Sequence, residues 1–436
     1  MAVAVRESRM FASLSHRNYR IYFVGALVSN IGTWIQRVAQ DWLVLELSGG
    51  SAVAVGITTA LQFLPALLLS PGGGLLADRV DKRLLLAVTQ TWMAASALVL
   101  GVMAIAGVAR TWHVYVIALV FGIGSAVDVP ARQAFVTEVA GRANLTNAIG
   151  LNSASFNAAR LIGPGVAGLI IGVWGSGWAI LTNAISYAAM LLALMALHVA
   201  DLDRTKPVAR AKGQVREGFR YVAARPDLLV ALGVGFAVGT FALNFQLTNA
   251  VMVSKEFGLG ARAYGWAGSV MGIGSLAGAL LAARRSRAPA LKCVVGASLV
   301  FAVLLGLLGF MPGYWTYLLL LPLVGLAGLL TMTATNMFVQ TTSDPSLRGR
   351  VMALYAMVMM GGTPIGAPLM GWLAQVFGPR APLIGGAVLQ VATIGAVLVV
   401  VRARFGSADQ WRPAGSVDQG AAPADEVPPE VALPPE

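Results

Sequence analysis

The amino-acid sequence predicts an all-α membrane protein with twelve transmembrane helices, and two observations carry that prediction. Hydrophobic residues make up 57% of the 436 residues and the mean hydropathy is +0.74, values outside the usage of soluble globular proteins. The apolar residues also fall into long runs, and a helix needs about 20 residues to cross the hydrocarbon core of a bilayer. The runs cover residues 20–47, 52–76, 84–107, 113–133, 147–173, 178–199, 228–253, 263–283, 291–312, 315–339, 350–375 and 382–401.

Basic residues gather at alternate ends of these predicted helices. Arg37 and Arg160 lie inside spans, away from the helix ends. The few on the minority side of the membrane are Arg110, Lys255, Arg262 and Arg380. This asymmetry follows the positive-inside rule, so we expect both termini in the cytoplasm. The net charge of +12 therefore sets orientation and does not indicate a nucleic-acid partner.

The sequence lacks the signatures of metal, cofactor and nucleotide chemistry. Its single cysteine, Cys293, excludes an intramolecular disulfide, and His16, His113 and His198 lie too far apart for metal-ligand spacing. There is no GxxxxGK[ST] loop to bind the phosphates of ATP. The glycine-rich stretches GVGFAVG and GIGSLAG lie inside apolar helices, where small residues allow close helix packing. We expect no metal, no cofactor and no ATP hydrolysis.

A charged, proline-containing segment at residues 201–227 divides the chain into two halves, 20–200 and 228–404, with six predicted helices each. The halves match at a shift of 203 residues, which places Gly122 on Gly325 and Gly168 on Gly371. Internal repeats of this kind predict two six-helix bundles related by a pseudo-two-fold axis along the membrane normal.

The chain ends lie outside the predicted bundles. Residues 1–19 are expected to form a cytoplasmic N-terminus. Residues 405–436 are rich in Pro, Ala and acidic residues, which predicts a disordered cytoplasmic tail.

Five charges occupy six positions in the stretch GGLLADRVDKRLLL, between the second and third spans. A cytoplasmic turn that anchors topology explains its basic residues but leaves Asp78 and Asp81 unexplained. The stretch resembles the loop signature of the major facilitator superfamily, usually G-x-L-a-D-R-x-G-R-K, with Asp81 where glycine is usual. The matching residues are Gly74, Asp78, Arg79, Lys82 and Arg83.

The resemblance implies a latch that holds the cytoplasmic side shut. Gly74 lets its helix approach a facing helix closely, so that Asp78 can reach the positive N-terminal end of a helix in the other half. Lys82 or Arg83 is expected to pair with Asp128.

A second pattern lies in the span 147–173. It resembles the antiporter pattern of the same superfamily, G-x8-G-x3-G-P-x2-G-G, with alanine at two glycine positions. Small residues permit tight packing against the other half and the proline bends the helix, although a generic small-residue face with a kink has the same spacing. The residues are Gly150, Ala159, Gly163, Pro164, Ala167 and Gly168.

Further stretches narrow the resemblance. DVPARQAFVTEV, LNSASFNAARLIGPGVAG and RGRVMALYAMVMMGGTPIGAPLMGW are similar to the bacterial exporter group that includes enterobactin-type siderophore exporters and macrolide efflux proteins. The likeness covers about residues 10 to 400. It implies a secondary active transporter that exports a small amphipathic molecule in exchange for protons.

Charged and polar residues inside the spans are the candidates for the transport site, because a charge at the bilayer centre costs about 2.5–3.5 kcal/mol on insertion scales. In the first span, Asn30, Thr33, Arg37 and Asp41 share one helical stripe, which we expect to line a watery cavity. Asp41 is the proton-coupling candidate. The alternative is that Arg37 and Asp41, one turn apart, neutralise each other.

Arg160 lies near the middle of its span and has two alternative roles. It can hold an acidic group of the substrate, or pair with a carboxylate of another helix. Uncharged polar residues are expected to complete the cavity, although buried interhelical hydrogen bonds also explain them. These residues are Asn157, Asn244, Thr248 and Thr331.

The sequence thus predicts an exporter in a bacterial cytoplasmic (inner) membrane, with a small-molecule substrate, protons and the lipid bilayer as its partners and a monomeric state. A nutrient or organic-anion importer of the same superfamily is the alternative, but it leaves the antiporter pattern unexplained. A polytopic membrane enzyme would need clustered Asp or His at a membrane face. A sensor or scaffold would need a sizeable soluble domain. The sequence has neither.

Overall fold

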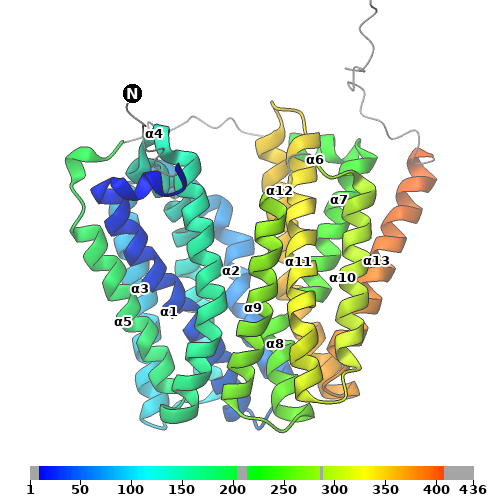
Figure 1. The fold of residues 1–436 in the computed structure, drawn as a ribbon, viewed down its shortest axis with the longest axis horizontal. Coiled ribbons are helices and arrows are strands. Elements are labelled where there is room, and N and C mark those ends of the chain that lie inside the picture. The colour runs from blue at the N-terminus through cyan, green and yellow to red at the C-terminus, as the bar shows by residue number, and fades with distance from the viewer. Residues whose placement is uncertain (1–8, 204–213, 285–287, 407–436) are drawn as a thin grey trace, which may run out of the picture.

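The computed structural model describes residues 9–203, 214–284 and 288–406, and within these ranges the chain forms helices and no strands. Figure 1 shows the helices standing side by side in two groups, with α1 to α5 in one and α6 to α13 in the other. The first group comprises α1 (Arg17–Leu47), α2 (Ala52–Arg79), α3 (Lys82–Ile105), α4 (Thr111–Trp174) and α5 (Ser176–Met195). The second comprises α6 (Gln214–Ala223), α7 (Pro226–Ala237), α8 (Phe245–Val251), α9 (Ala261–Ala283), α10 (Leu291–Gly309), α11 (Tyr314–Thr342), α12 (Arg348–Phe377) and α13 (Ala381–Phe405).

Each group crosses the membrane six times. Helix α4 contains two crossings, because Gly141 interrupts it with a left-handed backbone (φ 69°) that glycine adopts without a steric penalty. In the described ranges, eleven segments are long and apolar enough to span a bilayer. Helix α1 is the twelfth crossing; it has 31 residues, and polar side chains such as Gln36, Gln40 and Asp41 lower its hydropathy. The expected 6+6 arrangement is therefore confirmed.

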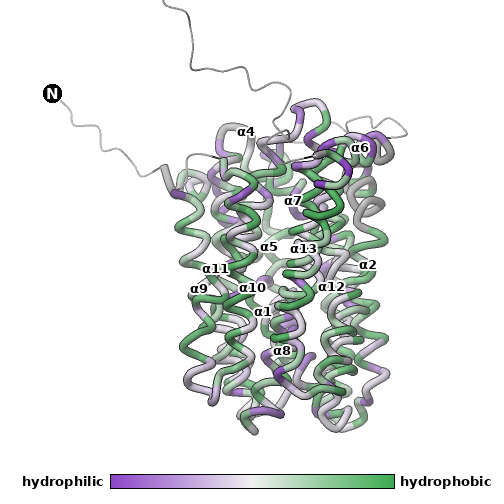
Figure 2. The backbone as a smooth tube through the Cα atoms, turned by 90° about the vertical axis from the view of Figure 1, so that its right-hand side faces the viewer, coloured by the Kyte–Doolittle hydropathy of each residue, from purple (hydrophilic) through white to green (hydrophobic). Residues whose placement is uncertain are grey.

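The outer surface of the two bundles is apolar. Many large hydrophobic side chains are exposed on it, among them Leu319, which is 81% exposed, and Trp315, which is 78% exposed. Figure 2 shows hydrophobic residues along most of the helix length and hydrophilic ones concentrated toward the ends. An apolar surface this continuous is matched to lipid rather than to water.

The predicted linker 201–227 contains a helix. Helix α6 lies within it and α7 begins at Pro226, while residues 204–213 of the linker fall outside the described ranges. The tail from residue 407 and the first eight residues also fall outside them.

The seventh crossing is broken, which the apolar run 228–253 did not reveal. Two π-helical turns, Val238–Ala242 and Met252–Glu256, flank α8, and Asn244 has a non-helical backbone (φ −95°, ψ 33°). Such turns leave backbone and side-chain groups without their regular helical partners and often occur at functional sites. The break lies where this crossing faces the other bundle, since α8 contacts α1 and α2.

The two bundles meet through glycines at one end of the molecule. A β-carbon at Gly168 of α4 would lie 2.9 Å from the carbonyl oxygen of Ala261 in α9. Likewise, a β-carbon at Gly371 of α12 would lie 2.6 Å from the carbonyl oxygen of Ala52 in α2. Backbones this close leave no passage between α4 and α9 or between α2 and α12 at this end.

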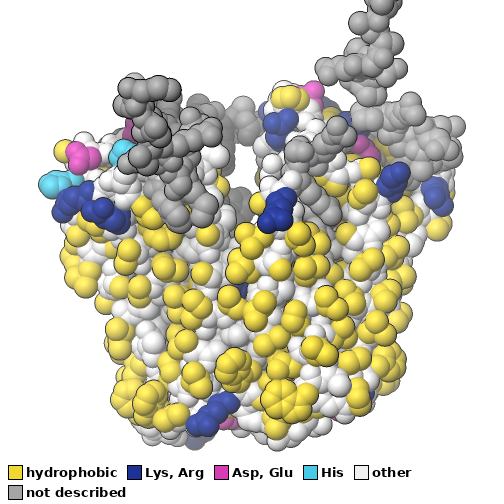
Figure 3. All heavy atoms as spheres, viewed as in Figure 1, with side chains coloured by type: hydrophobic (Ala, Val, Ile, Leu, Met, Phe, Trp, Pro, Cys, Tyr) yellow, Lys and Arg dark blue, Asp and Glu magenta, His cyan; other side chains and the backbone are white. Residues whose placement is uncertain are grey.

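The other end, where α1 begins, carries most of the Lys and Arg side chains, and we call it the basic end. Figure 3 shows those side chains gathered at the top and a hollow between the two bundles there. The molecule is therefore open between its halves at the basic end and closed at the opposite end.

Candidate functional site

A central site lies between the bundles and consists of two adjoining pockets. The first is lined by Trp34, Arg160, Pro164, Phe245, Gln246 and Tyr264, among others. The second is lined by Thr59, Phe63, Leu243, Asn244, Gln246, Leu247 and Thr363. Gln246 belongs to both, because the break in the seventh crossing brings this residue and its neighbours between the halves. The site thus combines apolar walls with a few polar groups, as small-molecule sites do.

Arg160 lines the first pocket, and Arg37 lies against Trp34 and Phe63, which line the first and the second pocket. Neither arginine has a hydrogen bond or an ion pair to another described residue. The guanidinium carbon of Arg37 lies 5.1 Å from the ring centroid of Trp34 and 5.4 Å from that of Phe63. That of Arg160 lies 5.9 Å from the same Trp34 ring. The Nε atom of Arg37 is buried and has no partner. Cation–π contacts are the close contacts that the described residues give to these two guanidinium groups, and Asp41 attracts Arg37 from a longer distance.

Asp41 makes a hydrogen bond that joins the two bundles. It is 3% exposed, and its Oδ2 accepts a hydrogen bond of 3.3 Å from the hydroxyl of Tyr264 in α9. The Tyr264 ring also stacks on Trp42, with centroids 5.8 Å apart. Arg37 does not come within ion-pair distance of Asp41 in the described structure, but the two charges attract each other over a longer distance, so the alternative that they neutralise each other stays a prediction. The two side chains separate because Arg37 turns toward the aromatic rings and Asp41 toward α9.

The remaining cavity candidates divide into two groups. Asn244 lines the second pocket; its Nδ2 donates to the carbonyl of Thr240, while its Oδ1 and the hydroxyl of Thr248 are buried without partners. Of the others, one bonds to a neighbouring helix and three bond to backbone carbonyls of their own helices. Asn30 donates to Ser155, Thr33 to the carbonyl of Ser29, Asn157 to the carbonyl of Ser153, and Thr331 to the carbonyl of Ala327.

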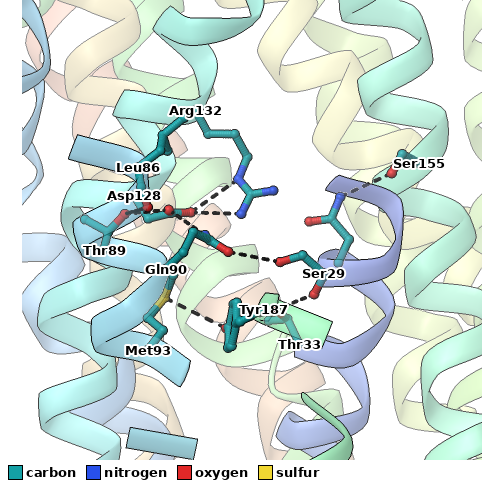
Figure 4. Close-up of polar contacts among 11 residues, drawn as sticks. Ser29, Thr33, Leu86, Thr89, Gln90, Met93, Asp128, Arg132, Ser155 and Tyr187 are labelled. Atoms are coloured by element: carbon teal, nitrogen blue, oxygen red, sulfur yellow. Dashed lines mark hydrogen bonds and ion pairs between the residues drawn. The ribbon is translucent and has the colours of Figure 1, made fainter. Parts of the chain in front are cut away.

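Asp128 has a buried network of its own (Figure 4). Its Oδ1 accepts from Thr89 at 2.8 Å and from Gln90 at 2.7 Å, and its Oδ2 pairs with Arg132 at 3.2 Å. The expected pairing of Asp128 with Lys82 or Arg83 is therefore wrong.

The antiparallel register of α3 and α4 explains the difference. Gln90 faces Asp128, so Lys82, two turns earlier on α3, faces Glu138 farther along α4 and pairs with it at 2.7 Å. Arg83 turns to the last carbonyls of α5 and donates to that of Leu194 at 2.7 Å.

The rest of the charged stretch lies at the turn between α2 and α3. Asp81 caps α3 by accepting a hydrogen bond of 3.0 Å from the backbone N–H of Leu84, and Arg79 is exposed in the last turn of α2. Helix α2 runs through Gly74 and Asp78, but their side-chain surroundings lie outside the described part of the structure.

The pattern in the second half of α4 contacts both bundles. Gly163 packs against Trp34 of α1, and Gly168 packs against α9. Pro164 contacts α9 as well, because added β-carbons at Gly265 and Gly268 would both meet it. Ala159 and Ala167 are fully buried, whereas a β-carbon at Gly150 would meet nothing.

A comparison with known families decides the classification. The model of the transmembrane secretion effector family, a branch of the major facilitator superfamily, matches residues 8–420. The chain belongs to this family.

Characterised relatives of this transmembrane secretion effector are efflux proteins and a siderophore transporter. It is 28% identical to the multidrug efflux pump Tap of Mycolicibacterium fortuitum, over 82% of this chain and 90% of the relative. It is 27% identical to the staphyloferrin A transporter of Staphylococcus aureus, with the same shares covered. Macrolide efflux protein A of Streptococcus pyogenes is 22% identical over 83% of this chain and 92% of the relative.

Solved structures share the fold. A bacterial homologue of the human lysosomal transporter Spinster, in an inward-facing conformation, superposes with a TM-score of 0.66 at 14% identity, covering 91% of this chain and 96% of that one. A transporter of the POT family superposes with a TM-score of 0.69 at 12% identity, covering 89% and 96%.

Sequence reasoning missed several residues of the central site in this secretion effector. Tyr264 lies near a predicted helix end, where an aromatic residue is usually a membrane-interface anchor. Trp34 and Phe63 are ordinary apolar residues of their spans. Gln246 was the one detectable signal, since a glutamine in an apolar run is as unusual as the asparagine at position 244.

Proposed function

We propose that this protein exports a small amphipathic molecule across a bacterial inner membrane by alternating access, in exchange for protons. The observation that carries the proposal is the central site, which is open toward the basic end and sealed at the other end by the α4–α9 and α2–α12 contacts. A substrate that enters from one side can leave on the other only after the bundles rock about this site. The efflux proteins among its relatives support export as the direction.

The charge distribution supports the orientation. Basic residues in short loops remain on the cytoplasmic side, so the basic end and both termini belong in the cytoplasm. The described conformation is then the one that loads substrate from the cytoplasm. Both halves of the central site come from one polypeptide, so a monomer suffices.

Asp41 is the proposed proton-coupling residue. Its bond from Tyr264 ties α1 to α9 beside the glycine contacts of the closed end, so opening that end must break the bond and expose the carboxylate to the outer solution. A carboxylate that changes its surroundings in this way also changes its proton affinity. Proton uptake outside and release at the basic end would then drive the cycle.

The charged stretch at residues 74–83 is proposed to act in the opposite conformation. With the basic end closed, Asp78 would reach the N-terminal end of a facing helix, with Gly74 allowing the approach. In the described conformation the bundles stand apart there (Figure 3).

A transport assay in cells tests the direction. A strain that lacks the gene is compared with the same strain carrying the wild-type gene for retention of carboxyfluorescein and of ethidium, an anionic and a cationic fluorescent probe. Export predicts lower retention of at least one probe in the complemented strain. Higher retention of either probe in the complemented strain would establish import and overturn the proposal.

A further inference from the structure

Two positive charges, Arg160 in the central site and Arg37 beside its aromatic walls, have no hydrogen-bond acceptor among the described residues. Within the part of the chain that the structure describes, neither Arg37 nor Arg160 has a hydrogen bond or an ion pair, although five other basic side chains there do form ion pairs. Buried arginines normally donate to carboxylates or carbonyls, since guanidinium groups carry five N–H donors. Two adjacent exceptions in one site point to a ligand that supplies the acceptors.

The carboxylate nearest in sequence can offset at most one of these two charges. Asp41, one turn from Arg37, is engaged by Tyr264 of the other bundle. Even with Asp41 ionised, the two arginines leave the site with a net positive charge. In a region where an uncompensated charge is costly, such an excess favours an anion.

The surroundings of the arginines select the rest of the ligand. Both guanidinium groups contact the Trp34 ring, and the pocket that Arg160 lines continues along Phe245, Tyr264 and Met271. A planar apolar body fits such walls by stacking, while its acidic group can reach the arginine donors.

We propose that the central site binds an organic acid, specifically the carboxylate of a molecule with an aromatic or otherwise apolar body, with Arg160 and Arg37 as the groups that recognise the acid. The inference rests on the proposed function and narrows its substrate class. It also agrees with export energetically, because moving an anion outward and a proton inward both follow an inside-negative membrane potential.

Binding of matched ligands to the purified full-length protein tests the inference. The probes are 2-naphthoate and anthracene-9-carboxylate, each compared with its neutral amide, and 2-naphthylmethylammonium as the cation, all measured by isothermal titration calorimetry in lipid nanodiscs. A charge-assisted hydrogen bond makes at least one acid bind about tenfold tighter than its amide. Arg160→Ala should reduce that ratio to about threefold or less, and Arg160→Lys should keep part of it.

The matched control is Arg404→Ala, which removes an arginine that contacts an aromatic ring, Phe405, at 5.2 Å outside the central site. It should leave the acid-to-amide ratio unchanged. The inference is overturned if no acid binds tighter than its amide, if the cation binds best, or if the ratio survives in the Arg37→Ala/Arg160→Ala double variant. The first two outcomes are measured on the wild-type protein alone, so the inference can be overturned even if a variant fails to fold.

The proposed function and the inference can fail separately. Export of ethidium without export of carboxyfluorescein would leave the exporter in place and overturn the organic-acid inference. If the protein transports neither probe but binds an acid in a way that depends on Arg160, the organic-acid inference is supported and the proposed export function is rejected.

Discussion

Replacing Gly168 by alanine should push the closed end of the transporter open. The new β-carbon would lie 2.9 Å from the Ala261 carbonyl oxygen and 3.0 Å from the Gly265 α-carbon. Both are backbone atoms of α9, so they cannot swing aside as the tip of a flexible side chain can. The strain is relieved when α4 and α9 separate, which is the movement that opens this end.

The size of the effect follows from the cost of overpacking. Extra methyl groups in a tightly packed interface cost about 1–3 kcal/mol. Since about 1.4 kcal/mol corresponds to a tenfold change in an equilibrium constant, the ratio of open to closed forms should rise about 5- to 150-fold. The contact exists only in the conformation that is closed at this end, so the penalty applies to one state and shifts the populations.

Double electron–electron resonance between spin labels at Ala106 and Thr316 measures the shift. Both positions are exposed at the closed end, one in each bundle, and the exposed native cysteine Cys293 is first replaced by serine. Gly150→Ala is the control, because its β-carbon would meet nothing although it belongs to the same sequence pattern. An unchanged distance distribution for Gly168→Ala, or an equal change for Gly150→Ala, would refute the reasoning.

Three further predictions follow from individual contacts. Tyr264→Phe keeps the stacking on Trp42 but removes the hydroxyl, which lies 3.3 Å from Asp41 Oδ2 and 3.1 Å from the carbonyl oxygen of Gln246. Because the contact with Asp41 joins the two bundles and the contact with Gln246 lies within one, the same spin labels should report about a tenfold shift toward opening. No shift would show that the bond to Asp41 does not hold the end closed. Glu138→Gln removes the carboxylate that pairs with the buried Lys82 and should lower the free energy of unfolding by about 3–5 kcal/mol, measured as a lower melting temperature. Glu217→Gln, in the more exposed Arg350–Glu217 pair, should lower it by less than about 1 kcal/mol. Equal effects of the two substitutions would show that the Lys82–Glu138 pair is not a buried pair that stabilises the fold. Asp78→Asn should insert and fold but transport slowly, and wild-type rates at matched expression would remove the latch from the mechanism.

The architecture could be predicted from the sequence because the bilayer imposes one requirement on every spanning helix. Long apolar runs marked the crossings. The break at Asn244 could not be predicted, since π-helical turns depend on packing against α1, α2 and α12 and leave the hydrophobic run uninterrupted.

The candidate site was only partly predictable. Arg37, Arg160 and Asp41 stand out in any apolar span because of their charge, but their partners depend on tertiary structure. Tyr264 reaches Asp41 from the other half of the chain. Asp128 forms its ion pair with Arg132, because the register between α3 and α4 places Lys82 opposite Glu138 instead.

Coupled flux in reconstituted vesicles tests the central claim most directly. Wild-type protein and Asp41→Asn are compared for proton flux and for movement of carboxyfluorescein and ethidium, first with a pH gradient and then with a substrate gradient alone. We expect uphill, proton-driven transport of a probe by the wild type. Asp41→Asn should lose that uphill transport while retaining exchange down a substrate gradient, because a side chain that cannot ionise cannot carry a proton. Full proton-driven accumulation by Asp41→Asn would contradict the claim that Asp41 carries the proton.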